Sequence, residues 1–208
     1  EGISFVLFDM RTPGVSVKPI KLISGLSPFC ETFLDDVRVP QANLVYELNK
    51  GWTVGKRLLQ HERASIGGIG GAQKTTSIEE YAKQYVGLDD EGKVDDAVLR
   101  GQILGHRMND AAFALTMKRS VQESATGTAP GAVSSMFKYY GTEQNKGKYE
   151  LLLSILGTLS LGWGGDTFAE DELNTTRAWL RSKANSIEGG TSEVQLNILA
   201  KRVLALPE

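Results

Sequence analysis

Hydrophobic and polar residues follow two different periods along the chain. Before residue 49 the apolar residues come in short runs separated by turn-forming residues, and the runs are Ile3–Phe8, Val15–Val17, Phe29–Phe33 and Val37–Val39. Short runs rich in β-branched and aromatic residues predict strands, and Thr12–Gly14 predicts a turn between the first two. Four such strands cannot form a stable sheet alone. Residues 1–48 are therefore predicted to be the last strands of a larger β domain, and the chain a fragment of a longer protein.

From Gly51 onward the apolar residues recur every three or four positions, which predicts helices with one apolar face. The stripes are Val54–Leu58–Ile66–Ile69, Leu104–Met108–Ala111–Leu115, Tyr149–Leu152–Leu153–Leu156 and Leu196–Leu199–Val203. Loop signals separate them at Gly87–Gly92, Thr126–Pro130 and Gly162–Asp166. Helices joined by short loops pack as an antiparallel bundle. The predicted fold class is therefore mainly α, with an antiparallel four-helix bundle in residues 49–208 preceded by the strands of residues 1–48.

Composition excludes several functional classes. The 208 residues are 41% hydrophobic and carry a net charge of −2, as in ordinary soluble globular proteins. No basic cluster supports binding to nucleic acid or to an anionic membrane, and the longest apolar run, Leu151–Trp163, is too short to span a bilayer. Two histidines and the lone Cys30 offer no metal site. The single cysteine and the lack of a secretory signal predict a reducing, cytoplasmic location.

Glu62 lies on a predicted apolar stripe, four residues after Leu58 and four before Ile66. A carboxylate on such a face is costly unless it is paired or protonated, and burial raises its pKa towards neutrality. These conditions suit a general base that acts near neutral pH. The alternative is an ion pair with Arg63 or another helix neighbour at the edge of the bundle. Spacing alone leaves both interpretations open.

Two glycine-rich segments are candidates for ligand contact. Ser65–Gly71 follows a helical pattern, and Gln73 stands where a dinucleotide fingerprint needs its third glycine, so that motif is rejected. Close helix packing or contact with a flat ligand explains these glycines. In Asn185–Gln195 a Gly-Gly turn leads into Thr-Ser-Glu, which predicts a helix N-terminus with Thr191 or Ser192 as its cap. Its backbone N–H groups suit a phosphate or a polar ring edge, although the segment also fits an ordinary helix cap.

Three blocks in this order resemble the acyl-CoA dehydrogenase family. Residues 2–46 (GISFVLFDMRTPGVSVKPI…ETFLDDVRVPQANLVY) resemble the last strands of its β domain. Residues 51–73 (GWTVGKRLLQHERASIGGIGGAQ) resemble the first helix of its C-terminal bundle, and residues 186–207 (SIEGGTSEVQLNILAKRVLALP) resemble its closing segment. The resemblance covers essentially the whole chain. It implies an N-terminal helical domain, a middle β domain and a C-terminal four-helix bundle, of which this chain holds the end of the second and the third.

The resemblance also implies a reaction in fatty acid metabolism, the FAD-dependent α,β-dehydrogenation of an acyl-CoA thioester. A carboxylate removes the α-proton while the β-hydride passes to flavin N5. The implied partners are the acyl-CoA substrate, electron-transfer flavoprotein or a similar acceptor, and further subunits in a homo- or heterotetramer formed through the bundle. Two alternatives stay open: a non-catalytic partner subunit of a heteromeric acyl-CoA dehydrogenase, and an acyl-CoA oxidase.

The family resemblance places the base at one of two positions. Many members carry it directly before the Gly-Thr-Ser of the closing motif, where this chain has Gly189. Isovaleryl- and long-chain-type members carry it on the first bundle helix in a Leu-x-x-Glu-Arg-like context, which here is Leu59–Arg63. The resemblance therefore implies Glu62 as the base. Glu188, one residue away from the commoner position, is the runner-up.

Cofactor contacts are implied at two places. The residues expected near the adenosine half of FAD are Gly190, Thr191, Ser192 and Glu193. Ser154 and Gly157 stand where family members have a Gln-x-x-Gly that contacts the FAD of a neighbouring subunit, and the serine departs from that pattern. The usual Arg-x-x-Phe-Gly flavin-phosphate segment is absent, and Tyr81–Asp90 stands in its place. FAD is therefore expected to be held differently, or only at some subunit interfaces.

Overall fold

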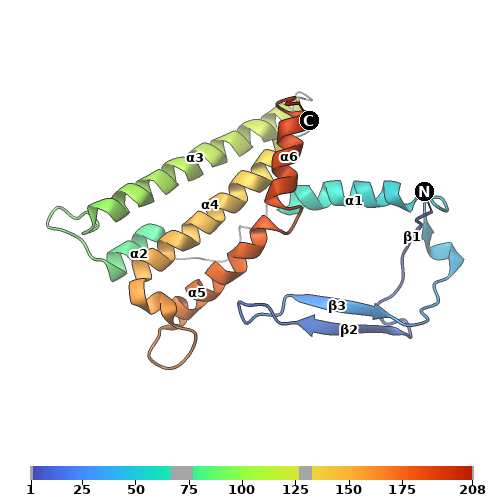
Figure 1. The fold of residues 1–208 in the computed structure, drawn as a ribbon, viewed down its shortest axis with the longest axis horizontal. Coiled ribbons are helices and arrows are strands. Elements are labelled where there is room, and N and C mark those ends of the chain that lie inside the picture. The colour runs from blue at the N-terminus through green and yellow to red at the C-terminus, as the bar shows by residue number, and fades with distance from the viewer. Residues whose placement is uncertain (1, 67–76, 127–132, 208) are drawn as a thin grey trace. The chain divides into compact units, whose positions relative to one another are not determined.

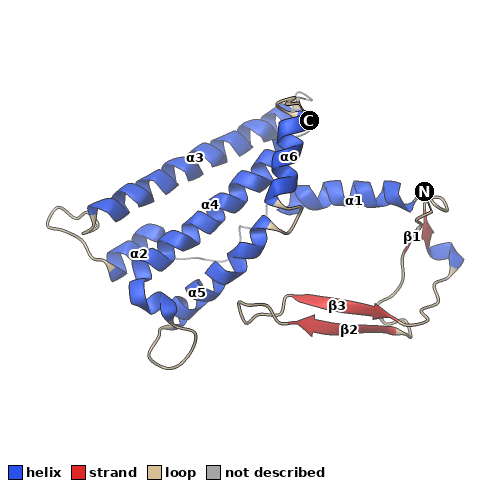
Figure 2. Ribbon diagram, viewed as in Figure 1, coloured by secondary structure: helices blue, strands red, loops and turns tan. Residues whose placement is uncertain are grey.

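A computed structural model describes residues 2–66, 77–126 and 133–207, except for the side chains of residues 60–66. The chain divides into two compact units, Glu1–Ser65 and Ile66–Glu208 (Figure 1). Among the described residues, the first unit holds short strands, a 3-10 helix and an α-helix, and the second unit is helical (Figure 2). The mainly α fold class is therefore confirmed. The domain boundary between residues 48 and 49 stays a prediction.

The first unit contains two antiparallel strand pairs. β1 (Phe5–Val6) pairs with β4 (Leu44–Val45), and β2 (Val15–Ile20) pairs with β3 (Phe29–Leu34). The short 3-10 helix η1 (Gln41–Asn43) precedes β4, and α1 (Gly51–Ile66) ends the unit. These pairs confirm that residues 1–48 hold short strands.

The position of one strand was predicted wrongly. Val37–Val39 does not form a strand, and the fourth strand is β4. Asp36 has a positive φ of 46°, which turns the chain out of the β2–β3 hairpin. Pro40 follows and cannot donate a ladder hydrogen bond. The two features interrupt the extended run that the apolar residues had predicted.

The second unit consists of helices that alternate in direction. Its α-helices are α2 (Ile78–Tyr85), α3 (Ala97–Ala125), α4 (Val133–Leu156), α5 (Glu170–Ser182) and α6 (Ser192–Arg202), and its 3-10 helices are η3 (Gly157–Leu161) and η4 (Lys183–Ser186). Successive helices α3, α4 and α5 run in opposite directions (Figure 1). The central helix α4 packs against α2, α3, α5 and α6. This antiparallel packing is consistent with the predicted bundle.

Side-chain caps fix where α2 and α3 begin. Ser77 Oγ accepts a hydrogen bond from the Glu80 N–H at 3.1 Å, and Glu80 Oε2 accepts one from the Ser77 N–H at 3.0 Å. Asp96 Oδ1 accepts from the Leu99 N–H at 2.9 Å. Each cap satisfies a backbone donor that has no partner within its helix. The predicted loop Gly87–Gly92 joins these two helices, while most of Thr126–Pro130 lies outside the described residues.

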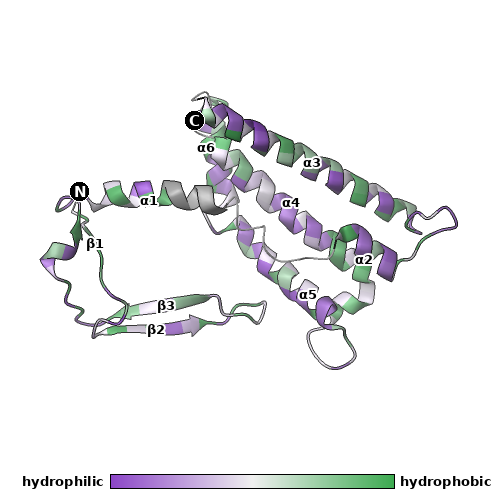
Figure 3. Cartoon of the chain, turned by 180° about the vertical axis from the view of Figure 1, so that it is seen from behind, coloured by the Kyte–Doolittle hydropathy of each residue, from purple (hydrophilic) through white to green (hydrophobic). Residues whose placement is uncertain are grey.

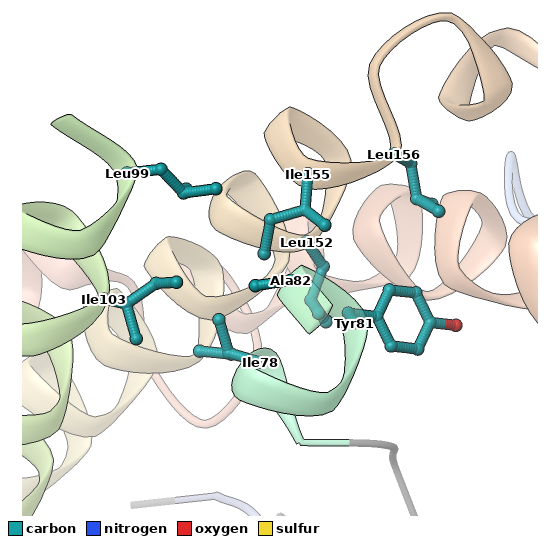
Figure 4. Close-up of a cluster of buried hydrophobic side chains, with 8 residues drawn as sticks. All are labelled: Ile78, Tyr81, Ala82, Leu99, Ile103, Leu152, Ile155 and Leu156. Atoms are coloured by element: carbon teal, nitrogen blue, oxygen red, sulfur yellow. The ribbon is translucent and has the colours of Figure 1, made fainter. Parts of the chain in front are cut away.

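A small apolar core lies where α2, α3 and α4 meet (Figure 4). Its buried residues are Ile78, Tyr81 and Ala82 from α2, Leu99 and Ile103 from α3, and Leu152, Ile155 and Leu156 from α4. Leu152 and Leu156 belong to a stripe that the sequence predicts. The core is thus built from three helices, and α2 closes it at one end.

The apolar stripe predicted on α3 does not face this core. Leu104, Met108 and Leu115 are 62%, 64% and 67% exposed, and hydrophobic bands run along the whole of α3 (Figure 3). The helix turns Leu99 and Ile103 towards α2 and α4 instead. The period therefore predicted the helix, but not the face that this chain buries.

No helix among residues 2–66, 77–126 and 133–207 is long and apolar enough to cross a membrane. The same residues contain no group of three or more His, Cys, Asp or Glu side chains arranged to hold a metal ion.

Candidate functional site at the closing turn

The predicted closing motif forms a tight turn between η4 and α6. Gly189 and Gly190 have positive φ angles of 66° and 92°, a conformation that glycine adopts without steric cost. Thr191 is the N-cap of α6, and its side chain accepts from the Val194 N–H at 3.3 Å. The predicted helix N-terminus is therefore confirmed, and the turn presents the positive end of the α6 dipole.

Gln195, in the first turn of α6, contacts the backbone of the Gly189–Gly190 turn. Its Nε2 donates to the Gly189 carbonyl oxygen at 3.2 Å. A Cβ at position 190 would lie 2.6 Å from the same Nε2. The backbone conformation therefore favours glycine at 190, and a larger residue there would also displace the Gln195 amide from the Gly189 carbonyl.

Two buried polar atoms beside the turn lack hydrogen-bond partners among the described residues. They are Ser192 Oγ and Gln195 Oε1, in side chains that are only 8% and 2% exposed. A buried polar atom without a partner costs about 1–3 kcal/mol. A ligand with polar edges at the N-terminus of α6 would satisfy such atoms. The structure thus brings the predicted residues Gly190, Thr191 and Ser192 together at one place.

Glu193 lies in the first turn of α6 and is exposed. A hydrogen bond from its own backbone N–H, and then one with the Thr191 side chain, hold the pKa of Glu193 below its usual value. A negative charge here stabilises the helix N-terminus. Glu193 therefore has a capping role in the structure, and its predicted contact with FAD stays a prediction.

Glu188, the runner-up base, is paired on both carboxylate oxygens. Its Oε2 accepts from Arg181 Nη2 at 2.8 Å, and its Oε1 accepts from Arg181 Nη1 at 3.4 Å and from Asn185 Nδ2. A forked contact of this kind fixes the orientation of the carboxylate as well as its distance from the guanidinium. The geometry favours a structural role for Glu188.

Polar residues of α4 hold the segment that leads into the turn. Lys138 Nζ donates to the Asn185 carbonyl oxygen at 2.9 Å, and Asn145 Nδ2 donates to Asn185 Oδ1 at 2.9 Å. Thr142 Oγ1 lies 3.3 Å from the same carbonyl oxygen and donates to the Lys138 carbonyl oxygen at 2.7 Å. Burial lowers the pKa of Lys138, against the opposite effect of nearby Glu188. Sequence reasoning missed these residues. The sequence showed their spacing along one helix, but not the partner that lies 40 or more positions later.

Ser154 and Gly157 lie at the other end of α4 and are exposed. Ser154 Oγ donates to the Glu150 carbonyl oxygen at 2.9 Å, and Gly157 has a φ of 55° where α4 passes into η3. Lys146 of α4 donates from Nζ to Ser186 Oγ in η4 at 2.8 Å. Eight residues of helix, about 12 Å, separate Lys146 from Ser154. The chain therefore does not bring these two residues to the closing turn, and their contact with the FAD of a neighbouring subunit stays a prediction.

The segment that stands in place of the flavin-phosphate motif faces α5. Tyr81 Oη lies 2.9 Å from Thr175 Oγ1. Burial is the main cause that raises the pKa of Tyr81. Burial, followed by a hydrogen bond with Glu172, also raises the pKa of Tyr85. Both tyrosines therefore tie α2 to α5, and neither presents a cation to a phosphate.

Glu62, the predicted base, lies on α1 in the first unit, which confirms its helical position. Its side chain lies outside the described part of the chain, as does most of the glycine-rich segment Ser65–Gly71. The assignment of Glu62 as the base therefore stays a prediction.

Helices with this order and this closing turn define the C-terminal domain of a flavoprotein dehydrogenase family. The model of the acyl-CoA dehydrogenase C-terminal domain matches residues 49–204, and the chain belongs to the acyl-CoA dehydrogenase family. The chain is 30% identical over 207 residues to acyl-CoA dehydrogenase FadE34 of Mycobacterium tuberculosis, covering 100% of the chain and 27% of that protein. It is 29% identical over 209 residues to acyl-CoA dehydrogenase IpdE1 of Mycolicibacterium smegmatis, covering 99% of the chain and 50% of that protein.

A solved structure shares the fold. A chain of the ChsE4–ChsE5 complex from Mycobacterium tuberculosis is 25% identical, with a TM-score of 0.75, over 100% of this chain and 53% of that one. The chain thus spans about half, or less, of the length of these relatives. Members of the acyl-CoA dehydrogenase family are FAD-dependent.

The closing turn fits one end of FAD. The unpartnered atoms of Ser192 and Gln195 and the capped N-terminus of α6 offer hydrogen bonds to a polar ring or ribose edge. The tyrosine-containing segment of α2 does not offer the arginine that a diphosphate favours. The unpartnered atoms of the turn are therefore compatible with a polar edge of the cofactor, and their contact with its adenosine half stays a prediction.

Proposed function

We propose that the protein to which this chain belongs catalyses the α,β-dehydrogenation of an acyl-CoA thioester, with Glu62 as the base. The match of residues 49–204 to the family's C-terminal domain carries this proposal. The closing turn supports it, because its glycines, its cap and its unpartnered buried oxygens suit contact with a polar ligand such as the adenosine half of FAD.

In this proposal each part of the chain has one task. FAD, when bound, accepts the hydride from the β-carbon. Glu62 takes up the α-proton on its carboxylate, which must be ionised before the reaction and protonated after it. Gly190, Thr191 and Ser192 hold the adenosine end through the backbone and hydroxyl groups at the start of α6. Precise placement of the cofactor matters because proximity and orientation supply much of the rate enhancement.

The role of Glu62 is tested by replacing it with Gln in the full-length protein loaded with FAD. Loss of a general base lowers the rate of flavin reduction by a saturating acyl-CoA by about 10²–10⁴-fold. The same change at Glu47, an exposed residue that precedes α1, serves as the control and leaves the rate unchanged. An undiminished rate in Glu62→Gln would show that another residue is the base.

A second candidate function is a non-catalytic partner subunit in a heteromeric complex. Two observations favour it. The α2 segment turns Tyr81 and Tyr85 towards α5 and lacks the flavin-phosphate motif, and the solved relative is a complex of two differently named proteins. If the full-length protein oxidises an acyl-CoA without a co-expressed partner, this candidate is ruled out.

The acceptor and the assembly remain proposals as well. An acyl-CoA dehydrogenase passes electrons to electron-transfer flavoprotein or a similar acceptor, whereas an acyl-CoA oxidase passes them to oxygen. Comparing turnover with each acceptor separates the two. A homo- or heterotetramer through the helical bundle would cover the exposed apolar residues of α3, and the mass of the full-length protein in solution tests this.

A further inference from the structure

We propose that Glu188 is a positioning residue, which holds the Gly189–Gly190 turn in the shape that receives the cofactor. It acts through Arg181 and Asn185 and takes no proton from the substrate. This inference rests on the FAD binding proposed above, and it assigns a role to a carboxylate that the family resemblance leaves as the runner-up base.

The contacts of Glu188 fix it in one place. Arg181, in the last turn of α5, reaches both carboxylate oxygens, with 2.8 Å between Nη2 and Oε2. Asn185, in η4, donates its amide N–H to Oε1. The pair is about one-third exposed, with 30% for the arginine side chain and 33% for the glutamate. A forked contact of this kind restricts orientation as well as distance.

Asn185 connects this pair to the central helix. Its carbonyl oxygen accepts from Lys138 Nζ, and its side-chain oxygen accepts from Asn145 Nδ2, both on α4. Its side-chain N–H groups remain for Glu188. The Glu188 carboxylate is therefore bound to α5 through Arg181 and to α4 through Asn185. Two helices thus hold Glu188, the residue directly before the turn.

The far side of the turn is fastened by Gln195, whose Nε2 donates to the Gly189 carbonyl oxygen at 3.2 Å. Gly189 and Gly190 have positive φ in the structure. Without contacts to hold them, two glycines would let this turn adopt many other conformations. Holding it from both sides removes that freedom before a ligand binds, and preorganisation of this kind increases affinity. Loss of the Glu188 contacts should therefore weaken FAD binding.

The test uses the full-length protein and measures the Kd of FAD with the variants Glu188→Gln, Arg181→Gln and the double variant. We expect each single variant to bind FAD about tenfold more weakly, as for the loss of a charge-assisted hydrogen bond. The double variant is expected to bind no more weakly than the weaker single one, because both changes remove the same contact. Glu91→Gln is the control, since Glu91 pairs only with Lys93 in an exposed loop among the described contacts.

Flavin reduction separates positioning from proton removal. At saturating FAD, Glu188→Gln should lose far less of its reduction rate than Glu62→Gln. If Glu188→Gln keeps its FAD affinity but cannot reduce the flavin, Glu188 is the base and the inference is overturned. Unchanged FAD affinity together with an unchanged reduction rate, or additive effects in the double variant, would overturn it too. A wild-type protein that binds no FAD would instead overturn the proposed function itself.

A variant that fails to fold does not end the test. Arg181→Lys keeps the positive charge and loses the fork of two N–H groups. Its Kd for FAD should lie between that of the wild-type protein and about tenfold higher. A Kd equal to the wild-type value would contradict a positioning role for the forked contact.

Discussion

Gly190 and Gly87 share a φ of 92° but differ in their surroundings. A Cβ at 190 would lie 2.6 Å from Gln195 Nε2, whereas no described atom lies within 4 Å of a Cβ at 87. Gly87→Ala should cost about 1–2 kcal/mol, from the left-handed backbone alone. Gly190→Ala should cost about 1 kcal/mol more, because the Gln195 amide must leave the Gly189 carbonyl. Urea unfolding measures both, and equal losses would contradict the close approach at position 190.

A single residue, His106, also makes the free energy of unfolding depend on pH. Burial lowers its pKa from 6.5, and Lys148 and Arg107 act in the same direction, against Asp110 and Glu79. The unfolded chain therefore binds the proton more tightly than the folded chain. The free energy of unfolding has its full value above about pH 6.5 and falls as the pH drops towards the pKa of His106 in the folded chain. His106→Gln should flatten this part of the profile of urea midpoint against pH. An unchanged slope in the variant would show that another group causes it.

In helix α3 the apolar stripe that the sequence predicts is not the face that is buried. Leu99 is 7% exposed and packs in the core, whereas Leu104 is 62% exposed on the same helix. Leu99→Ala should destabilise this chain by about 2–4 kcal/mol. Leu104→Ala should change its stability by less than about 0.5 kcal/mol. Thermal unfolding of the two variants provides the comparison, and similar losses would mean that the second leucine is also buried.

Strand and cap signals show how much of the elements could be predicted. Val15–Val17 and Phe29–Phe33 fall inside the observed hairpin, because turn residues and β-branched runs act over a few neighbours. Val37–Val39 carries the same signal but is not a strand, because Asp36 turns the chain and Pro40 lacks a donor. Thr191 or Ser192 was predicted as the cap, and Thr191 is the cap, since capping depends only on the next three residues.

At the scale of the whole molecule, we propose that the described residues provide only part of a flavin site. In this proposal the closing turn contacts the adenosine half, while the tyrosines of α2 contact α5. We therefore expect the 208-residue chain alone to bind FAD weakly or not at all. Dialysis followed by a flavin absorbance spectrum tests this, with the full-length protein as the control. Stoichiometric flavin retained by the chain alone would contradict it.

The sequence by itself determined the helical period, the N-terminus of α6, the Gly-Gly turn and the family, because these depend on neighbours along the chain or on ordered motifs. Only the tertiary structure decided which face of α3 is buried. It also decided that Glu188 pairs with Arg181, and that Lys138 of α4 binds the Asn185 carbonyl in the segment before the turn. The physical reason is that such contacts join residues from different helices. Their distances depend on how the helices pack, and the spacing of residues within one helix does not contain that information.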